Sequence, residues 1–269
     1  MAPGIDYSRA SFAQIIRAAV DDLTSRGYQS EAQVDYWAML IREAARRTTT
    51  PDHEIESALR KHFGREYEKV INRLNRVERF GLASIEPTLH AEIERRIRTA
   101  ADLIKVNKTE RVEQTLSRFR GWCSSVPPGG SRATDKREVA SHIAKPTQRQ
   151  KFEARRVAID QGHKLAANLE EVVAIHGGAI AGVWHDRGEH DSNYDARKAH
   201  LARSGKVFLV RDSWAIKQGL VRRGAATYMD EIERPAELPF CSCKYKYLSS
   251  IRDLPEDWLT EKGRDALSH

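Results

Sequence analysis

The chain has 269 residues, of which 40% are hydrophobic and 31% charged, and its formal net charge is +7. This length is enough for a large core, and two domains are the default expectation. No apolar run approaches the ~18–20 residues of a membrane span, and the first residues lack the basic and apolar regions of a secretory signal, so we expect no membrane partner and no export.

Positive charge is concentrated in the middle of the chain. Residues 95–156 contain 16 Lys and Arg against 6 Asp and Glu, a balance of +10, so the remainder carries −3. This distribution favours a polyanionic partner such as DNA, bound through its phosphates without sequence preference. The alternative is a set of solvated helix faces with local ion pairs. The candidates for contact with nucleic acid are Arg95, Arg96, Arg98, Lys136 and Arg137.

The first 120 residues show the apolar periodicity of helices, with stripes beginning near Phe12, Val34, Ile55 and Leu89 and a further one over 109–119. The first of these helices has clear end signals. Ser11 and Gln14 form a capping-box pattern, and Gly27 is a typical stop. Pro51 suits the first position of a later helix, and Gly64 predicts a break or bend in it.

The segment 124–136 is rich in Ser, Pro and Gly, and it is the predicted linker between a helical region, 1–123, and a second domain, 137–269. Two more helices are expected at 136–145 and 147–176.

Strand character follows at 179–185 and 206–212. The predicted fold class is therefore α+β and mainly α, with an N-terminal helical region followed by a small α+β domain that contains a short antiparallel sheet.

Several residues of the second domain stand in a suggestive order. Trp184 ends the first predicted strand, Arg197 precedes His200 by three positions, and Gly205 follows His200 by five. A Pro-Phe-Cys-Ser-Cys-Lys stretch then brings Cys241 and Cys243, two of the three cysteines in the chain.

This order resembles the head morphogenesis, or minor capsid, family of tailed bacteriophages typified by the phage Mu F protein. The family pattern is Trp, a polar turn with an acidic residue, Arg-x-x-His, Gly five residues past the His, and Cys-x-Cys-Arg. Lys244 stands where Arg is commoner, and the Trp-to-His segment is about four residues longer than the pattern asks. His185 and Asp186 replace small hydroxyl residues, and the acidic position falls on Asp191 or Asp195.

The resemblance covers roughly residues 150–248 and implies a structural minor head protein of a tailed phage. Such a protein is expected inside the virion near the portal, and in the host cytoplasm during assembly. It would act in head assembly, DNA packaging or ejection, with portal, major capsid or scaffolding proteins and packaged DNA as partners. The motif residues would be structural, with no catalytic residue and no obligatory cofactor.

Two other interpretations stay open on the residues themselves. His200, Cys241 and Cys243 offer ligands for zinc, although Cys-x-Cys is not the usual two-residue knuckle, and free thiols in a packed turn are the alternative. The run His185–Asp191 concentrates metal-ligating side chains, and with His200 it is compatible with a metal-dependent nuclease or a toxin-like enzyme of phage origin. A run of this composition is also typical of a solvated loop.

Overall fold

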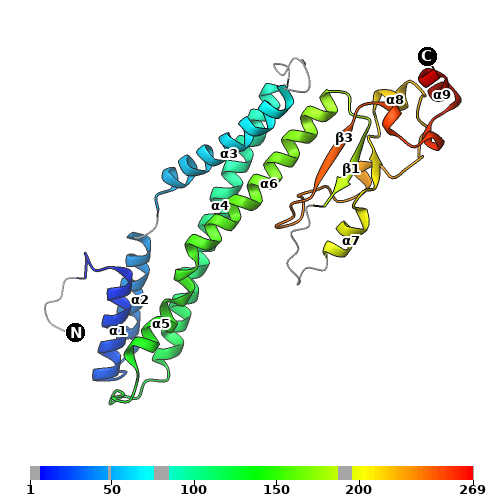
Figure 1. Cartoon of the computed structure of the whole chain (residues 1–269). Helices are drawn as coiled ribbons and strands as arrows, with labels where there is room; N and C mark the ends of the chain where they lie inside the picture. The colour runs from blue at the N-terminus through cyan, green and yellow to red at the C-terminus, as the bar shows by residue number, and fades with distance from the viewer. Residues whose placement is uncertain (1–6, 48–49, 76–84, 187–195, 269) are drawn as a thin grey trace. The chain divides into compact units, whose positions relative to one another are not determined.

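The computed structural model of the chain describes residues 7–47, 50–75, 85–186 and 196–268, apart from the side chains of 73–75, 196 and 197. The described part is mainly helical and has one small antiparallel sheet, which confirms the predicted fold class (Figure 1). The α-helices are α1 (Phe12–Arg26), α2 (Glu31–Arg47), α3 (Asp52–Asn75), α4 (Glu86–Cys123), α5 (Lys136–Gln148), α6 (Gln150–His176), α7 (Ala196–Arg203), α8 (Trp214–Lys217) and α9 (Glu261–Ser268). The strands are β1 (Ala181–His185), β2 (Val207–Leu209) and β3 (Lys244–Leu248), and the short 3-10 helices are η2 (Met229–Glu231), η3 (Ile251–Asp253) and η4 (Glu256–Trp258).

The chain forms two compact units that do not follow chain order. Unit 1 comprises residues 1–58 and 99–157, and unit 2 comprises 59–98 and 158–269. The helices α3, α4 and α6 each contribute residues to both units. The segment 124–136, where the sequence predicted a division, lies within unit 1. That segment is attached to the end of α1: the Ser131 amide donates to the Thr24 carbonyl at 2.9 Å, and the Tyr28 amide donates to the Pro127 carbonyl at 3.3 Å.

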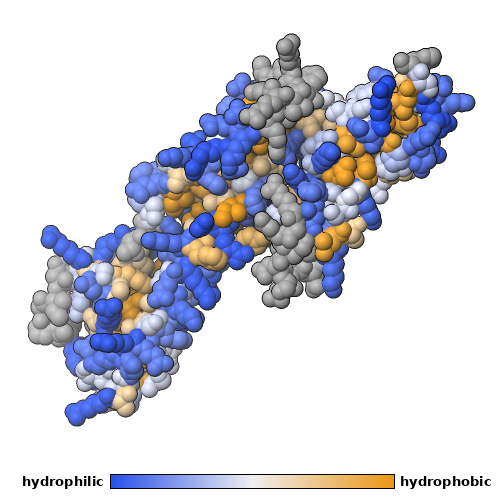
Figure 2. Space-filling view, in the orientation of Figure 1, coloured by the Kyte–Doolittle hydropathy of each residue, from blue (hydrophilic) through white to orange (hydrophobic). Residues whose placement is uncertain are grey.

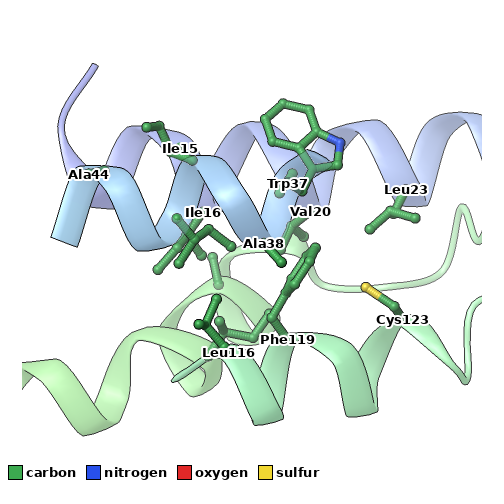
Figure 3. Close-up of a cluster of buried hydrophobic side chains, with 14 of the residues drawn as sticks. Ile15, Ile16, Val20, Leu23, Trp37, Ala38, Ala44, Leu116, Phe119 and Cys123 are labelled. Carbon is green, nitrogen blue, oxygen red and sulfur yellow. The ribbon is translucent and has the colours of Figure 1, made fainter. Parts of the chain in front are cut away.

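Unit 1 is a helical core built from α1, α2, α5 and the C-terminal part of α4. The predicted capping box of α1 is confirmed, since the Gln14 amide donates to Ser11 Oγ and the Ser11 amide donates to Gln14 Oε1. The predicted stop at Gly27 is confirmed as well. The apolar stripes of these helices meet in a buried cluster (Figure 3), whose largest members include Ile15, Ile16, Leu23, Trp37, Ile41, Leu116 and Phe119.

One prediction about the helices was wrong. Gly64 does not break the helix that contains it, because α3 continues through it from Asp52 to Asn75. A Cβ at Gly64 would meet nothing within 4 Å, so the glycine serves no close approach. The stripes predicted from Leu89 and over 109–119 belong to one continuous helix, α4.

The sheet lies in unit 2 and has the order β2-β1-β3, with both pairs antiparallel (Figure 1). The strands predicted within 179–185 and 206–212 are confirmed as β1 and β2, whereas β3 was not predicted. Its sequence, KYKYL, does alternate with the period of a strand. In the pairing of β1 with β3, Trp184 lies opposite Tyr245, and both side chains are buried on the same face of the sheet.

Hydrophilic residues cover most of the face shown in Figure 2, and hydrophobic residues form small patches between them. Among the described helices, none combines the length and the apolar character that crossing a membrane requires.

Candidate functional site

The candidate site is a buried cluster on one face of the sheet in unit 2. β1 is the central strand, and Trp184 near its end is fully buried. The Trp184 ring meets the rings of His200 and Tyr245 edge to face, with centroids 5.0 and 5.6 Å apart. The imidazole of His200 therefore packs against the indole of Trp184.

His200 belongs to α7, and the turn from α7 into β2 fixes its position beside Trp184. Gly205 follows α7 with a φ of +79°, a conformation that favours glycine. Its amide donates to the Trp184 carbonyl at 2.9 Å, and the Trp184 amide donates to the Lys206 carbonyl at 2.9 Å. These two bonds attach the end of α7 to β1, so the spacing of five from His200 to Gly205 has a structural reason.

Cys241 and Cys243 reach the cluster from the segment that leads into β3. In extended backbone, residues two apart point to the same side, so a Cys-x-Cys pair presents both thiols together. Cys241 Sγ lies 3.5 Å and Cys243 Sγ lies 3.6 Å from His200 Nδ1. All three side chains are buried, with 4% exposure for His200 and 9% and 6% for the cysteines.

Two polar groups border these three residues. Cys243 Sγ lies 3.7 Å from Asp186 Oδ1, just after β1, and Glu233 Oε2 lies 3.9 Å from His200 Nε2 on the other side of the ring. The position of Glu233 beside His200 was missed by sequence reasoning, and no local signal could have found it, because the two residues are 33 positions apart in the chain. Asp186 was noted only as part of the His185–Asp191 run.

The cysteine pair favours one negative charge. A hydrogen bond from the Cys243 thiol lowers the pKa of Cys241 to about 5 against the opposing effect of burial, with help from the Ala236 amide, whose nitrogen is 3.3 Å from Cys241 Sγ. The same hydrogen bond, together with burial and the nearby negative charges, raises the pKa of Cys243. The pair thus presents a thiolate beside a thiol to the imidazole, an arrangement of soft and borderline ligands that suits a metal ion.

The structure brings five of the six predicted motif residues into this cluster: Trp184, His200, Gly205, Cys241 and Cys243. The sixth, Arg197, belongs to α7, but its side chain lies outside the described residues. Of the run proposed for a nuclease, His185 is exposed at the end of β1 and Asp186 faces Cys243. The rest of that run, including Asp191, and the alternative acidic position Asp195 lie outside the described residues.

The predicted nucleic-acid contacts in unit 2 differ in exposure. Arg96 is only 12% exposed and binds Glu92 at 2.8 Å and Gln161 at 3.1 Å. Arg95 also binds Glu92, at 2.7 Å, but is more than half exposed. Arg98 is exposed. Arg96 is therefore part of the packing of this unit, and Arg98 is the better placed to meet a phosphate.

In unit 1, Lys136 pairs with Asp21, whereas Arg137 is exposed in the first turn of α5. The same unit has a basic hollow of about 350 Å³ that was not predicted. Its charged lining consists of four cations and two acids: Arg42, Arg46, Lys105, Lys108, Asp52 and Glu113. Burial lowers the pKa of Lys108, whose Nζ has no hydrogen-bond partner among the described residues.

Comparisons of the chain with protein-family models, with curated proteins and with solved structures gave no match. The resemblance to the phage head family therefore rests on the motif residues alone.

Proposed function

We propose that this protein is a structural minor head protein of a tailed bacteriophage, of the Mu F-like type. It would be a low-copy component of the inner capsid near the portal that acts in head assembly, DNA packaging or ejection. The observation that supports the proposal is the convergence of Trp184, His200, Gly205, Cys241 and Cys243. These residues belong to separate elements that are far apart in the sequence. Their convergence in one cluster is what a shared motif would require.

A structural role fits the environment of the cluster better than a catalytic one. His200 and both thiols are buried, and Trp184 covers one side of the imidazole. A nucleophile or general base must lie within hydrogen-bond reach of a substrate, which requires an open position. The cluster instead joins α7, β1 and the segment before β3, so its effect is to stabilise this part of unit 2.

The proposed partners are those that the resemblance implies. Portal, major capsid or scaffolding proteins would contact the helical surfaces, and packaged DNA would contact exposed cations such as Arg98 and Arg137 through its phosphates. Arg96 is not proposed for this contact, because its guanidinium is engaged with Glu92 and Gln161.

Assembly into heads tests the proposal. The chain would be co-expressed with the portal and major capsid proteins of the same genome, and heads would be purified on a density gradient after nuclease treatment. We expect the chain in the head fraction at low copy number, and at the top of the gradient when it is expressed alone. Heads that form without the chain in their fraction would contradict the proposal.

A nuclease assay on the purified chain distinguishes the structural proposal from the enzyme alternative. If the purified chain degraded DNA or RNA with added Mg²⁺ or Mn²⁺, and if His185→Ala or His190→Ala abolished this activity, the metal-dependent nuclease would replace the structural proposal. We expect no such activity above that of a mock purification.

A further inference from the structure

The ligand atoms of His200, Cys241 and Cys243 all lie within 4.8 Å of one another in a buried position. We propose that they bind a structural Zn²⁺ ion, that Asp186, which contacts Cys243, turns toward them as the fourth ligand, and that Glu233 orients the imidazole. The inference concerns the stability of unit 2 and does not depend on the proposed role in the phage head.

The distances between the ligand atoms agree with tetrahedral zinc. Zn–S bonds of about 2.3 Å and Zn–N bonds of about 2.0–2.1 Å, at a tetrahedral angle, place nitrogen and sulfur about 3.6 Å apart. The two Sγ atoms lie 3.5 and 3.6 Å from His200 Nδ1. A carboxylate oxygen in the same tetrahedron would lie about 3.5 Å from each sulfur ligand. Asp186 Oδ1 lies 3.7 Å from Cys243 Sγ, but its carboxylate is not within 4.8 Å of all three ligand atoms, so it must turn toward them to complete the set.

The imidazole is oriented to use Nδ1 as a ligand. Its other nitrogen, Nε2, is buried without a hydrogen-bond partner among the described residues, and the Glu233 carboxylate lies 3.9 Å from it. The negative charge of that carboxylate favours the tautomer with the proton on Nε2, which leaves the Nδ1 lone pair directed at the two sulfur atoms. A carboxylate behind a metal-bound histidine commonly has this effect.

Two residues shortly before Cys243 have a backbone conformation that is costly for residues other than glycine. Ala236 and Phe240 have φ values of +63° and +59°, although neither is glycine. The Ala236 amide points at Cys241 Sγ, and the Phe240 amide donates to Asp160 Oδ1 at 2.5 Å. Left-handed residues of this kind persist where the surroundings fix them, and they concentrate at ligand clamps.

Zinc is the metal that this ligand set favours. Two cysteine sulfurs, the second of which would lose its proton to solvent when the metal binds, select against Mg²⁺ and Ca²⁺, which prefer oxygen. Tetrahedral coordination by sulfur and nitrogen is typical of Zn²⁺. Because three ligands are buried and Asp186 would take the fourth position, the described residues leave no open position for a substrate, and the expected role is structural.

Elemental analysis of protein purified without added metal tests the site. We expect about one zinc per chain in the wild type and less than about a tenth of this amount in Cys241→Ser/Cys243→Ser. The matched control is Cys123→Ser, which removes the third cysteine, buried in the core of unit 1, and should keep the zinc. Zinc retained by the double variant would overturn the assignment.

Because the double variant could fail to fold, the wild type provides a second test. Zinc would be removed with a chelator under reducing conditions and replaced with Co²⁺. We expect the visible bands of tetrahedral cobalt together with a near-ultraviolet thiolate charge-transfer band, and a drop in melting temperature in the metal-free protein. Reduced protein that binds neither Zn²⁺ nor Co²⁺ would overturn the proposal.

The fourth ligand has its own variant. Asp186→Asn should weaken zinc binding by about tenfold or more in competition with a chelator, because a neutral amide is a poorer ligand than a carboxylate. An unchanged affinity would remove Asp186 from the ligand set.

Discussion

At the scale of single residues, Asp22 is a buried carboxylate whose charge is stabilised by three donors. Its side chain is 8% exposed and accepts hydrogen bonds from Trp37 Nε1 at 2.8 Å, from Gln33 Nε2 at 3.1 Å and from Arg26. Burial alone would raise the pKa of Asp22, but these hydrogen bonds outweigh it and hold the pKa below its usual value. They join α1 to α2, so the charge contributes to the stability of unit 1.

This contribution depends on pH in a defined direction. Because the folded pKa is depressed, Asp22 stabilises the fold above its unfolded pKa of about 3.9, and the stabilisation is lost as the pH falls through the folded value. Asp22→Asn should lower the free energy of unfolding at pH 7 by about 1–3 kcal/mol, and the difference from wild type should shrink in acid. Urea denaturation followed by circular dichroism measures both effects.

The neighbouring residue gives the control. Asp21 is exposed and pairs with Lys136 at the surface, so Asp21→Asn should change stability by no more than about 1 kcal/mol. Equal effects of the two substitutions at pH 7 would show that the three donors to Asp22 add nothing.

At the scale of elements, the junction between α1 and the segment 124–136 depends on a glycine. Gly27 has φ +76° and ψ +176°, a region that side chains other than glycine avoid. A Cβ there would lie 2.0 Å from the Pro128 carbonyl oxygen and 2.5 Å from the Gly130 nitrogen. Gly121, inside α4, has nothing within 4 Å of the position that a Cβ would take.

The same substitution should therefore have opposite effects at the two positions. Gly27→Ala should destabilise unit 1 by more than about 2 kcal/mol, because the backbone conformation and the contact with Pro128 both oppose it. Gly121→Ala should stabilise it by about 0.5–1 kcal/mol through helix propensity. Melting temperatures of the two variants decide the matter, and a tolerated Gly27→Ala would mean that the 124–136 segment does not pack on α1.

At the scale of the whole molecule, the cations of 95–156 differ in their surroundings. Arg96 and Lys136 are engaged in ion pairs, whereas Arg98 and Arg137 are exposed to solvent. Because Arg98 and Arg137 are exposed, they can contact a phosphate with less desolvation and rearrangement than Arg96 or Lys136 would require.

Arg98→Gln/Arg137→Gln should weaken binding to random-sequence duplex DNA and reduce the slope of log affinity against log salt by up to about 2. Arg96→Gln should instead lower the melting temperature, because Glu92 would lose a buried partner. Fluorescence anisotropy at several salt concentrations measures the first effect. Binding without salt dependence, or binding that the double variant leaves unchanged, would contradict a role of these residues on DNA.

The sequence by itself determined the apolar stripes of α1 to α6, whereas α7, α8 and α9 were not predicted. Capping at Ser11, the stop at Gly27 and the apolar stripes act between residues at most four or so apart, so they can be recognised without knowledge of the fold. The strands β1 and β2 and the mainly α class were found in the same way, whereas Trp184, His200, Gly205, Cys241 and Cys243 were singled out because their order resembles the phage head family.

Only the tertiary structure decided which distant residues meet. Glu233 beside His200, Gln161 beside Arg96 and the pairing of β3 with β1 join positions that are tens of residues apart. The tertiary structure also outweighs the low helix propensity of Gly64, since α3 is continuous there. Such contacts depend on how whole elements pack, and packing is fixed by many weak interactions at once, so no single spacing in the sequence records it.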